Sequence, residues 1–273
     1  MKIISADERL AEKRGAKILI LGPTGIGKTS LLRTVSHLDR VLFVDIEAGE
    51  LAVIDLKVPT IRIDDWRTAR DLACRIGGPN KSFSADLCYS PAHFEAVGGW
   101  LEGLDQIDTI FVDSLTAISR LSFRNAEQQP EAFSERTGRK DLRGAYGLHG
   151  REMVLWLNQL QHARALNVVF VGILEYAVDD LNRGVWQLQA EGSKTSRELP
   201  GIVDQIITYQ FLDFADGQPP MRGFVTTAPN AWGYPAKDRS GRLDLIEPPD
   251  LGRLLAKLIT KTEKTDDNKT KPQ

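Results

Sequence analysis

The strongest constraint on the fold is a glycine-rich segment near the amino end, Gly22-Pro23-Thr24-Gly25-Ile26-Gly27-Lys28-Thr29-Ser30. Residues 22–29 satisfy the pattern G-x-x-x-x-G-K-[ST]. A continuous apolar run, 16–21, precedes it, and such runs are typical of strands buried on both faces of a parallel sheet. Apolar residues at helical spacing follow it: Leu31, Leu32, Val35 and Leu38. The sequence therefore predicts a strand, a glycine loop and a helix, in that order.

A loop of this kind is suited to bind phosphate. Glycines let the backbone wrap so that successive N–H groups point at phosphate oxygens, and the positive end of the following helix adds to the attraction. We expect Lys28 to contact the β- and γ-phosphates of ATP and the Thr29 hydroxyl to be a ligand of Mg²⁺. The alternative is a glycine-rich turn without a ligand, and the flanking strand and helix argue against it.

Acidic residues follow two of the other predicted strands. Asp113 ends the run TIFVD, where a magnesium site beside a triphosphate needs a carboxylate, and Asp45, which ends VLFVD, is the competing candidate. Glu47 comes just after that second strand, where its carboxylate can orient or deprotonate the attacking water. We therefore predict Asp113 as the magnesium carboxylate and Glu47 as the catalytic base.

The rest of the chain alternates strands and helices early, and strands and turns late. This order predicts an α/β fold with a mostly parallel central sheet, flanking helices and antiparallel strands near the carboxyl end. Two long polar stretches, 119–150 and 175–201, are expected to be loops. The further expected strands are 41–45, 109–113, 168–173, 203–211 and 223–227, and the further expected helices start near Asp65, Ser90, Gly150 and Asp250.

At this point the chain resembles a family. GPTGIGKTS, FVDIEAG and TIFVDSLTAI occur in the order found in the RecA-type ATPase core, and in particular in compact phage nucleotide-binding proteins that act as RecA-like single-strand annealing recombinases. The resemblance covers 16–259. It implies an ATPase that uses ATP and Mg²⁺, acts in phage or prophage recombination, and assembles as a homo-oligomer, either a ring or a filament. A single-strand DNA-binding protein is a further partner that it implies.

The segment Ala236-Lys237-Asp238-Arg239-Ser240-Gly241 is similar to the K-x-R-x-G element of RecA-like recombinases and hexameric helicases. The resemblance implies that Lys237 and Arg239 reach the γ-phosphate held by a neighbouring subunit, so that hydrolysis depends on assembly. A charged hairpin tip accounts for the same residues. Lys194 and Arg197 are a second candidate pair for this role.

Both polar stretches lie where the resembling recombinases hold single-stranded DNA. The first combines cations, which attract phosphates, with aromatic faces that stack bases, at Phe123, Phe133 and Tyr146. Its cations outnumber its acids: Arg120, Arg124, Arg136, Arg139, Lys140, Arg143 and Arg151 against Glu127, Glu131, Glu135 and Asp141. The second carries Tyr176 and Trp186 but more acids than bases. Solvated loops with aromatic residues packed beneath them are the alternative for both.

Composition limits the remaining possibilities. The 273 residues contain 35 Lys+Arg and 37 Asp+Glu, so the net charge of −2 gives no global attraction to nucleic acid. With no apolar run of signal-peptide or membrane-span length, the expected compartment is the cytoplasm, with no membrane partner. We expect a polar segment 1–15, one ATPase domain 16–260 and a disordered tail 261–273. A helicase, a packaging motor, a regulatory nucleotide-binding module and a small-molecule kinase remain alternative functions.

Overall fold

The computed structural model describes residues 3–134, 136–178, 182–213 and 219–259. The expected tail 261–273 lies outside these residues. The strands are β1 (Lys17–Gly22), β2 (Val41–Asp45), β3 (Thr60–Arg62), β4 (Thr109–Asp113), β5 (Asn167–Val178), β6 (Gly184–Leu188), β7 (Gln205–Leu212), β8 (Met221–Val225), β9 (Lys237–Asp238) and β10 (Ile246–Glu247). The α-helices are α1 (Ala6–Ala11), α2 (Trp66–Gly77), α3 (Pro91–Ala96), α4 (Leu115–Ala126), α5 (Leu142–Gln161), α6 (Ser193–Ile202) and α7 (Leu251–Ile259). Short 3₁₀ helices are η1 (Thr29–Thr34), η2 (Leu38–Arg40), η3 (Gly49–Val53), η4 (Leu104–Gln106) and η5 (Pro130–Ala132).

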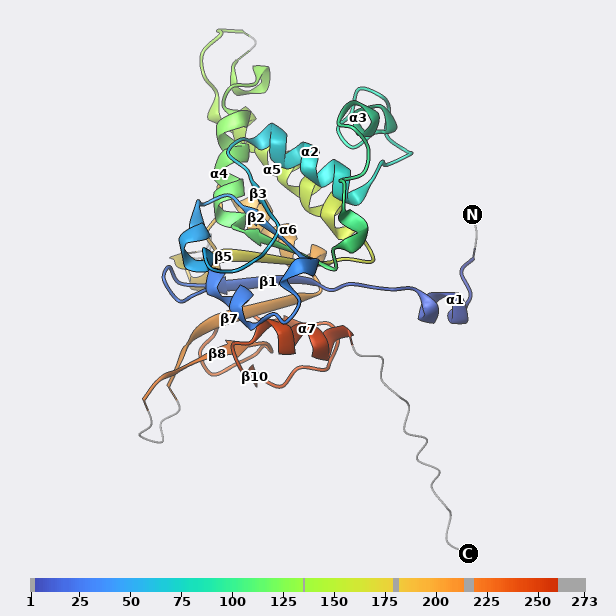
Figure 1. Ribbon diagram of the computed structural model, residues 1–273. Helices are drawn as coiled ribbons and strands as arrows, with labels where there is room; N and C mark the ends of the chain where they lie inside the picture. The colour runs from blue at the N-terminus through green and yellow to red at the C-terminus, as the bar shows by residue number, and fades with distance from the viewer. Residues whose placement is uncertain (1–2, 135, 179–181, 214–218, 260–273) are drawn as a thin grey trace, which may run out of the picture.

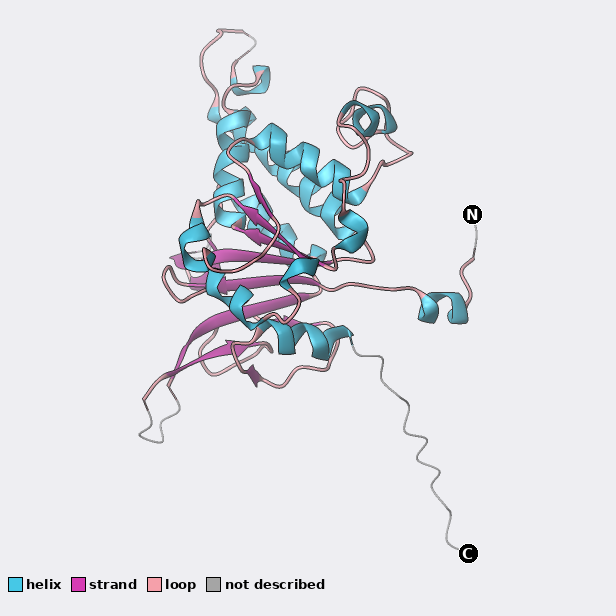
Figure 2. Ribbon diagram, viewed as in Figure 1, coloured by secondary structure: helices cyan, strands magenta, loops and turns pink. Residues whose placement is uncertain are grey.

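The sheet has the strand order β10-β8-β7-β1-β5-β4-β2-β3. Pairing is parallel from β7 through β1, β5, β4 and β2 to β3, and antiparallel where β8 joins β7 and β10 joins β8. The predicted fold class is therefore confirmed. In the parallel part, the carboxyl ends of β1, β2 and β4 lie at one edge, because parallel strands all run the same way (Figures 1 and 2).

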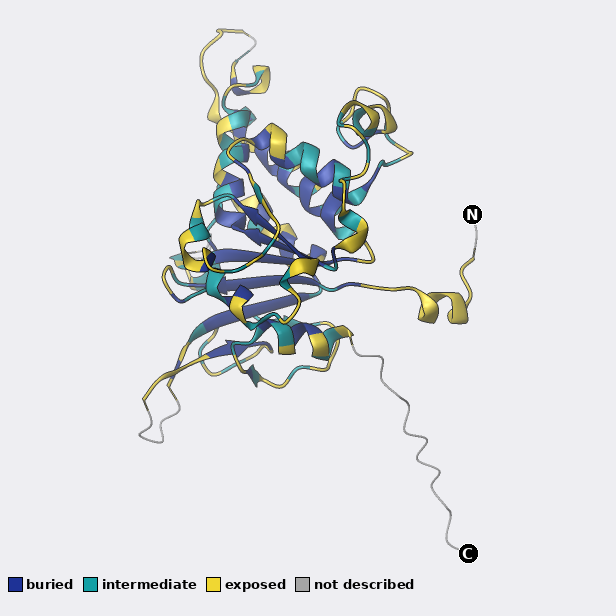
Figure 3. Ribbon diagram, in the orientation of Figure 1, coloured by how far each residue is buried: buried dark blue, intermediate teal, exposed yellow. Residues whose placement is uncertain are grey.

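Helices cover both faces of the sheet, and the central strands are buried throughout (Figure 3). Alternate strand residues serve the two faces: Leu19 and Leu21 pack with α2, α4, α5 and α6, whereas Ile18 and Ile20 pack with η1 and α7. Each face therefore has its own apolar core.

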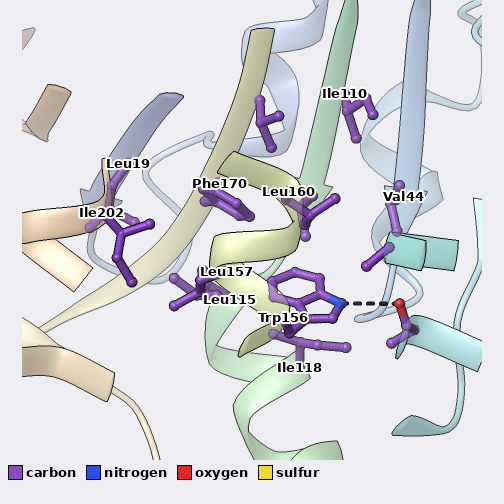
Figure 4. Packing of buried hydrophobic residues seen from close by; sticks show 14 of the residues in the cluster. Leu19, Val44, Ile110, Leu115, Ile118, Trp156, Leu157, Leu160, Phe170 and Ile202 are labelled. Carbon is purple, nitrogen blue, oxygen red and sulfur yellow. Dashed lines mark hydrogen bonds between the residues drawn. The ribbon is translucent and has the colours of Figure 1, made fainter. Parts of the chain in front are cut away.

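Trp156 of α5 joins the larger core to α2 (Figure 4). Its side chain is 3% exposed, packs against Phe170 with ring centroids 5.9 Å apart, and donates from Nε1 to the Ala69 carbonyl at 3.0 Å. The hydrogen bond satisfies the one polar atom of a large buried ring, so the indole fixes how the two helices pack.

The expected loop 119–150 was wrong, because α4 and α5 occupy most of it. Ser119, Ser122 and Ala126 are buried on one side of α4. In the sequence, the small and polar side chains of this stretch suggested a loop instead of a buried helix face. Two of the glycines of α5, Gly144 and Gly150, are places of close approach rather than breaks. A Cβ on Gly144, for example, would stand 1.7 Å from the Glu131 carbonyl oxygen.

The second expected loop, 175–201, was also wrong. β5 continues to Val178, pairs antiparallel with β6 so that Tyr176 lies opposite Trp186, and is followed by α6. Half-buried and exposed residues alternate along 175–178, as expected for a strand, but the polar composition of the stretch concealed the strand in the sequence.

The helix after the glycine loop is shorter than predicted. It is the 3₁₀ helix η1, and Val35 is already extended. Thr34 ends it, because its hydroxyl donates to the Leu31 carbonyl at 2.7 Å and accepts from the Leu251 N–H at 2.8 Å. The helix expected from Ser90 also ends early, at Ala96, and is followed by Gly98 and Gly99 at positive φ.

The amino-terminal helix α1 extends away from the sheet and has no buried residue (Figures 1 and 3). Cys74 and Cys88 are free thiols. None of the helices in the described part of the chain combines the length and the hydropathy that crossing a bilayer requires.

The packing of Trp156 generates a stability prediction. Replacing Trp156 with Ala removes a buried ring and its hydrogen bond, so the free energy of unfolding should fall by about 3–5 kcal/mol. Denaturant titration followed by circular dichroism measures this. Leu155, on the same helix and 37% exposed, is the control: Leu155→Ala should cost far less. Equal losses in the two variants would contradict the assigned core.

Candidate nucleotide-binding site

The glycine loop connects β1 to η1 at the carboxyl edge of the sheet. Gly25 and Gly27 adopt φ values of 80° and 102°, which favour glycine and let the backbone turn sharply. The Lys28 ammonium group folds over this loop and donates to the carbonyls of Gly22 at 3.0 Å and Pro23 at 2.9 Å. The lysine thus lies beside the loop, where the motif requires it.

Thr29 and Asp113 form the contact that ties the loop to the neighbouring strands. The Thr29 hydroxyl donates to Asp113 Oδ2 at 2.5 Å. Asp113 is the last residue of β4 and is 3% exposed. A hydroxyl and a carboxylate far apart in the sequence are thereby brought together, in the pair predicted for magnesium.

Asp45, the competing carboxylate, lies opposite Asp113 in the register of β2 and β4. It is buried, and its Oδ1 accepts the Gly49 N–H at 3.0 Å. That bond holds the turn after β2, in which Ala48 has a left-handed φ of 55°. Asp45 therefore shapes the turn, while Asp113 is the carboxylate that reaches Thr29.

Glu47 is exposed in that turn and accepts a hydrogen bond from the hydroxyl of Ser114, the residue after Asp113. The same hydroxyl caps α4 by accepting the Ala117 N–H at 3.2 Å. Glu47 is thus held at the end of β4, beside the loop, with one face toward solvent. This is the position that a base acting on water needs.

Burial and neighbouring charges shift the pKa values of two groups in this cluster, Asp113 and Lys28. Burial raises the pKa of Asp113 to about 6, with the negative charge of Glu47 adding to the rise and the Thr29 hydroxyl and Lys28 opposing it. Burial also lowers the pKa of Lys28, and the two carboxylates oppose that fall. Because burial disfavours the charged form of this carboxyl group, a cation beside it stabilises the carboxylate.

The donors fit a magnesium nucleotide. In the described part of the chain, His, Cys, Asp and Glu side chains nowhere gather in threes to hold a metal ion by themselves. A hydroxyl and a single carboxylate leave most positions of an oxygen-preferring ion to water and phosphate, which is the usual arrangement for Mg²⁺ bound with a triphosphate. Thr29 and Asp113 would hold the ion, and the loop would hold the phosphates.

Lys237 and Arg239 lie away from this cluster. β9 pairs with Gln205 and Ile206 at the start of β7, whereas the glycine loop follows the end of the parallel strand β1. Lys237 donates to the carbonyls of Pro200 at 2.5 Å and Val203 at 2.8 Å, and Arg239 is paired with Asp204 at 2.9 Å. Within one subunit they lie at the edge of the sheet opposite the glycine loop. Their action on the phosphate of a neighbouring subunit therefore stays a prediction.

The other candidate pair, Lys194 and Arg197, lies on α6. Lys194 is 3.9 Å from Glu198, one helical turn along, and its stem packs over Gly150 of α5. This pair also stays a prediction.

Aromatic side chains line a surface hollow of about 440 Å³ beside the β5–β6 hairpin. Tyr176 is 62% exposed, and ring centroids of neighbouring pairs lie 5.0 Å apart for Tyr176–Trp186 and 5.4 Å apart for Trp186–Tyr234. Trp232 completes the lining. Gly22 of β1 lies opposite Ile173 of β5, so the hairpin starts just beyond the level of the glycine loop.

The basic residues of 120–151 are all exposed on α4, α5 and the segment between them. That segment projects from the top of the molecule in Figures 1 and 3. Of its aromatic residues, Phe133 and Tyr146 are each 43% exposed, and Tyr146 stacks on Phe123 with centroids 4.5 Å apart.

Two residues near the loop escaped the sequence analysis. Arg222 of β8 donates to the Ile26 carbonyl at 3.3 Å, and the Tyr209 hydroxyl of β7 lies 3.8 Å from where a Cβ on Gly27 would stand. Neither belongs to a motif. Only the pairing of β7 with β1 and β8 brings them to the loop.

Comparison with known proteins agrees with this geometry. A family model described as "AAA domain" matches residues 14–240. The chain belongs to this AAA domain family. With the glycine loop, that membership identifies a P-loop NTPase core. No curated protein sequence matches the chain. Among solved structures, the KaiC-like protein PH0186 from Pyrococcus horikoshii OT3 is 11% identical, with 78% of each chain covered and a TM-score of 0.39.

The raised pKa of Asp113 predicts a pH-dependent stability. Its folded pKa of about 6 exceeds the ordinary 3.8, so its stabilising effect is complete below about 3.8 and is lost as the pH rises through 6. The free energy of unfolding of Asp113→Asn, relative to that of wild type, should therefore rise by on the order of 3 kcal/mol between pH 4 and 7 in the absence of Mg²⁺ and nucleotide. Denaturant titrations across this range measure the gain. A difference between Asp113→Asn and wild type that stays constant across this pH range would contradict the assignment.

Proposed function

We propose that this chain is a magnesium-dependent ATPase that binds single-stranded DNA and acts in recombination by annealing or pairing strands. The observation that carries the ATPase part is the meeting of four side chains from three separate segments: Lys28 and Thr29, Glu47, and Asp113. The hydroxyl–carboxylate pair, the lysine on its loop and an exposed glutamate nearby are the parts that phosphoryl transfer to water uses.

Each of these side chains has a distinct task in the proposed reaction. When bound, Mg²⁺ supplies charge that neutralises the phosphate oxygens. Lys28 exchanges the Gly22 and Pro23 carbonyls for β- and γ-phosphate oxygens, which form stronger, charge-assisted bonds. Glu47 orients the attacking water and takes its proton, and the Ser114 hydroxyl keeps that carboxylate in place.

The nucleic-acid part of the proposal draws support from the aromatic hollow and the basic α4–α5 segment. Stacking on aromatic side chains tolerates any base sequence, and exposed arginines attract the phosphates between bases. The hollow is stiffened because Asn230 Oδ1 accepts the N–H groups of Trp232 at 3.3 Å and Tyr234 at 3.1 Å. A platform of this stiffness holds bases at a small cost in conformational entropy.

Assembly completes the proposal. A homo-oligomer would bring Lys237 and Arg239 of one subunit toward the site of the next, which requires them to leave Pro200, Val203 and Asp204. A motor that unwinds or moves along nucleic acid is the competing function for the same parts. Annealing of complementary strands without unwinding supports the recombinase, and ATP-driven unwinding supports the motor.

The ATPase part makes a prediction at two residues. Lys28→Ala should abolish ATP binding or turnover, because it removes the ammonium group that lies on the Gly22 and Pro23 carbonyls, where we expect the β- and γ-phosphates. Glu47→Gln should keep nucleotide binding but lower kcat by roughly 10²–10⁴-fold, the usual contribution of a general base. Steady-state phosphate release and equilibrium ATP binding give both readouts, with the exposed Lys57→Ala as control. Unchanged turnover in Lys28→Ala would exclude this site.

The DNA-binding part makes a separate prediction. Tyr176→Ala and Trp232→Ala should each weaken binding of a single-stranded oligonucleotide by roughly 5–150-fold, the equivalent of one lost stacking contact. Fluorescence anisotropy measures this. Trp100, which is 57% exposed and packs against Phe94 instead, is the matched control. If Trp100→Ala weakens binding as much as the other two variants, the hollow is not the binding surface.

A further inference from the structure

The glycine loop has two flanks in the sheet, one on each side of β1. Because the strand order is β8-β7-β1-β5-β4-β2, Asp113 and Glu47 approach the loop from one side of β1. β7 and β8 approach it from the other side. On that second flank the Arg222 guanidinium donates through Nη1 to the Ile26 carbonyl at 3.3 Å.

The loop is shaped to admit this guanidinium. A Cβ on Gly27 would stand 3.3 Å from Arg222 Nη1 and would crowd it. The same Cβ position is 3.9 Å from the Ser30 Cβ, so Arg222 faces the part of the loop that leads into η1. A positive charge therefore lies against the same backbone that presents its N–H groups to phosphate.

Tyr209 holds Arg222 in this place. Tyr209 and Arg222 are diagonal neighbours on one face of the β7–β8 pair, since Tyr209 lies opposite Phe224 and Phe211 lies opposite Arg222. Tyr209 is 2% exposed, and its ring packs edge-on against Phe224 at 5.1 Å. Burial raises the pKa of its hydroxyl, while the charge of Arg222 and a hydrogen bond from it oppose the rise.

The hydrogen bond from the exposed Arg222 guanidinium to the Ile26 carbonyl is weak. It is long and its acceptor is a neutral carbonyl, whereas a phosphate oxygen forms shorter and roughly twice as strong bonds with arginine. Where the magnesium ion and the terminal phosphate lie against Asp113, as in the proposed ATP site, the opposite flank with Arg222 is the side toward the nucleoside. We propose that Arg222 is a nucleotide-binding residue, acting within its own subunit on the phosphate nearest the nucleoside. This inference rests on the proposed ATP site.

ATP and ADP share the phosphate nearest the nucleoside, so loss of the proposed contact should weaken binding of both. Loss of a contact with the terminal phosphate would weaken binding of ATP alone. Dissociation constants for ATP and ADP are measured by isothermal titration calorimetry for wild type, Arg222→Gln and Arg222→Lys. Arg222→Gln should weaken both nucleotides by the same factor, on the order of tenfold or more, as expected for one lost charge-assisted bond. Arg222→Lys should fall between it and wild type, and the exposed Arg253→Gln should match wild type.

A second variant tests the role of Tyr209 as a positioning residue. Tyr209→Phe keeps the ring and removes only the hydroxyl, so it should weaken ATP and ADP by one smaller common factor. It should add nothing in the Arg222→Gln background, which a merely structural effect of the ring would not predict.

Three results would overturn the inference. Affinities of Arg222→Gln equal to those of wild type would remove Arg222 from the site and leave the proposed function intact. A loss confined to ATP would place the contact at the terminal phosphate instead. Wild-type protein that binds neither nucleotide would overturn the proposed function and this inference together.

Discussion

The hydrogen bond between Thr29 and Asp113 is the contact on which the rest of the site depends. It joins a loop that follows β1 to the end of β4, although β5 lies between these strands in the sheet. The parallel register makes this possible, because every strand in this part of the sheet ends at the same edge. Asp45 then holds the turn that carries Glu47, and Ser114 links Glu47 back to the end of β4. Asp113 and the adjacent Ser114 thus connect the loop to Glu47, the residue that we propose as the catalytic base.

Burial gives this contact its chemical character. A carboxylate in the interior is costly to ionise, which is why the pKa of Asp113 rises to about 6 even with Lys28 close by. A cation that coordinates Asp113 relieves this cost, so the same burial that weakens the isolated acid strengthens its response to a divalent ion. Arg222 adds positive charge on the other flank. The loop therefore lies between an acid side that favours a metal ion and a basic side that favours an anion.

Local signals predicted most of the fold. Strands β1, β2, β4 and the first part of β5 were predicted from apolar runs, whereas the short and largely exposed strand β3 was not predicted. The caps at Asp65, Ser90 and Asp250 are present because each needs only a side chain and its own first helical turn. Predictions failed where the deciding contact lies far away in the sequence. Gly144 suggested a loop, but it lies in a helix pressed against Glu131. Arg222 gave no signal at all, since only strand pairing brings it to the loop. Site residues within the motifs were accessible from the sequence, and their supporting neighbours were not.

A crystal structure with magnesium and a non-hydrolysable ATP analogue tests the central claim most directly. The account predicts phosphates wrapped by Gly25 and Gly27, with the ion against the Thr29 hydroxyl and the Asp113 carboxylate and with the Lys28 ammonium moved from the two loop carbonyls onto the nucleotide. An analogue bound elsewhere on the chain, or a magnesium ion with no contact to Thr29 or Asp113, would contradict it.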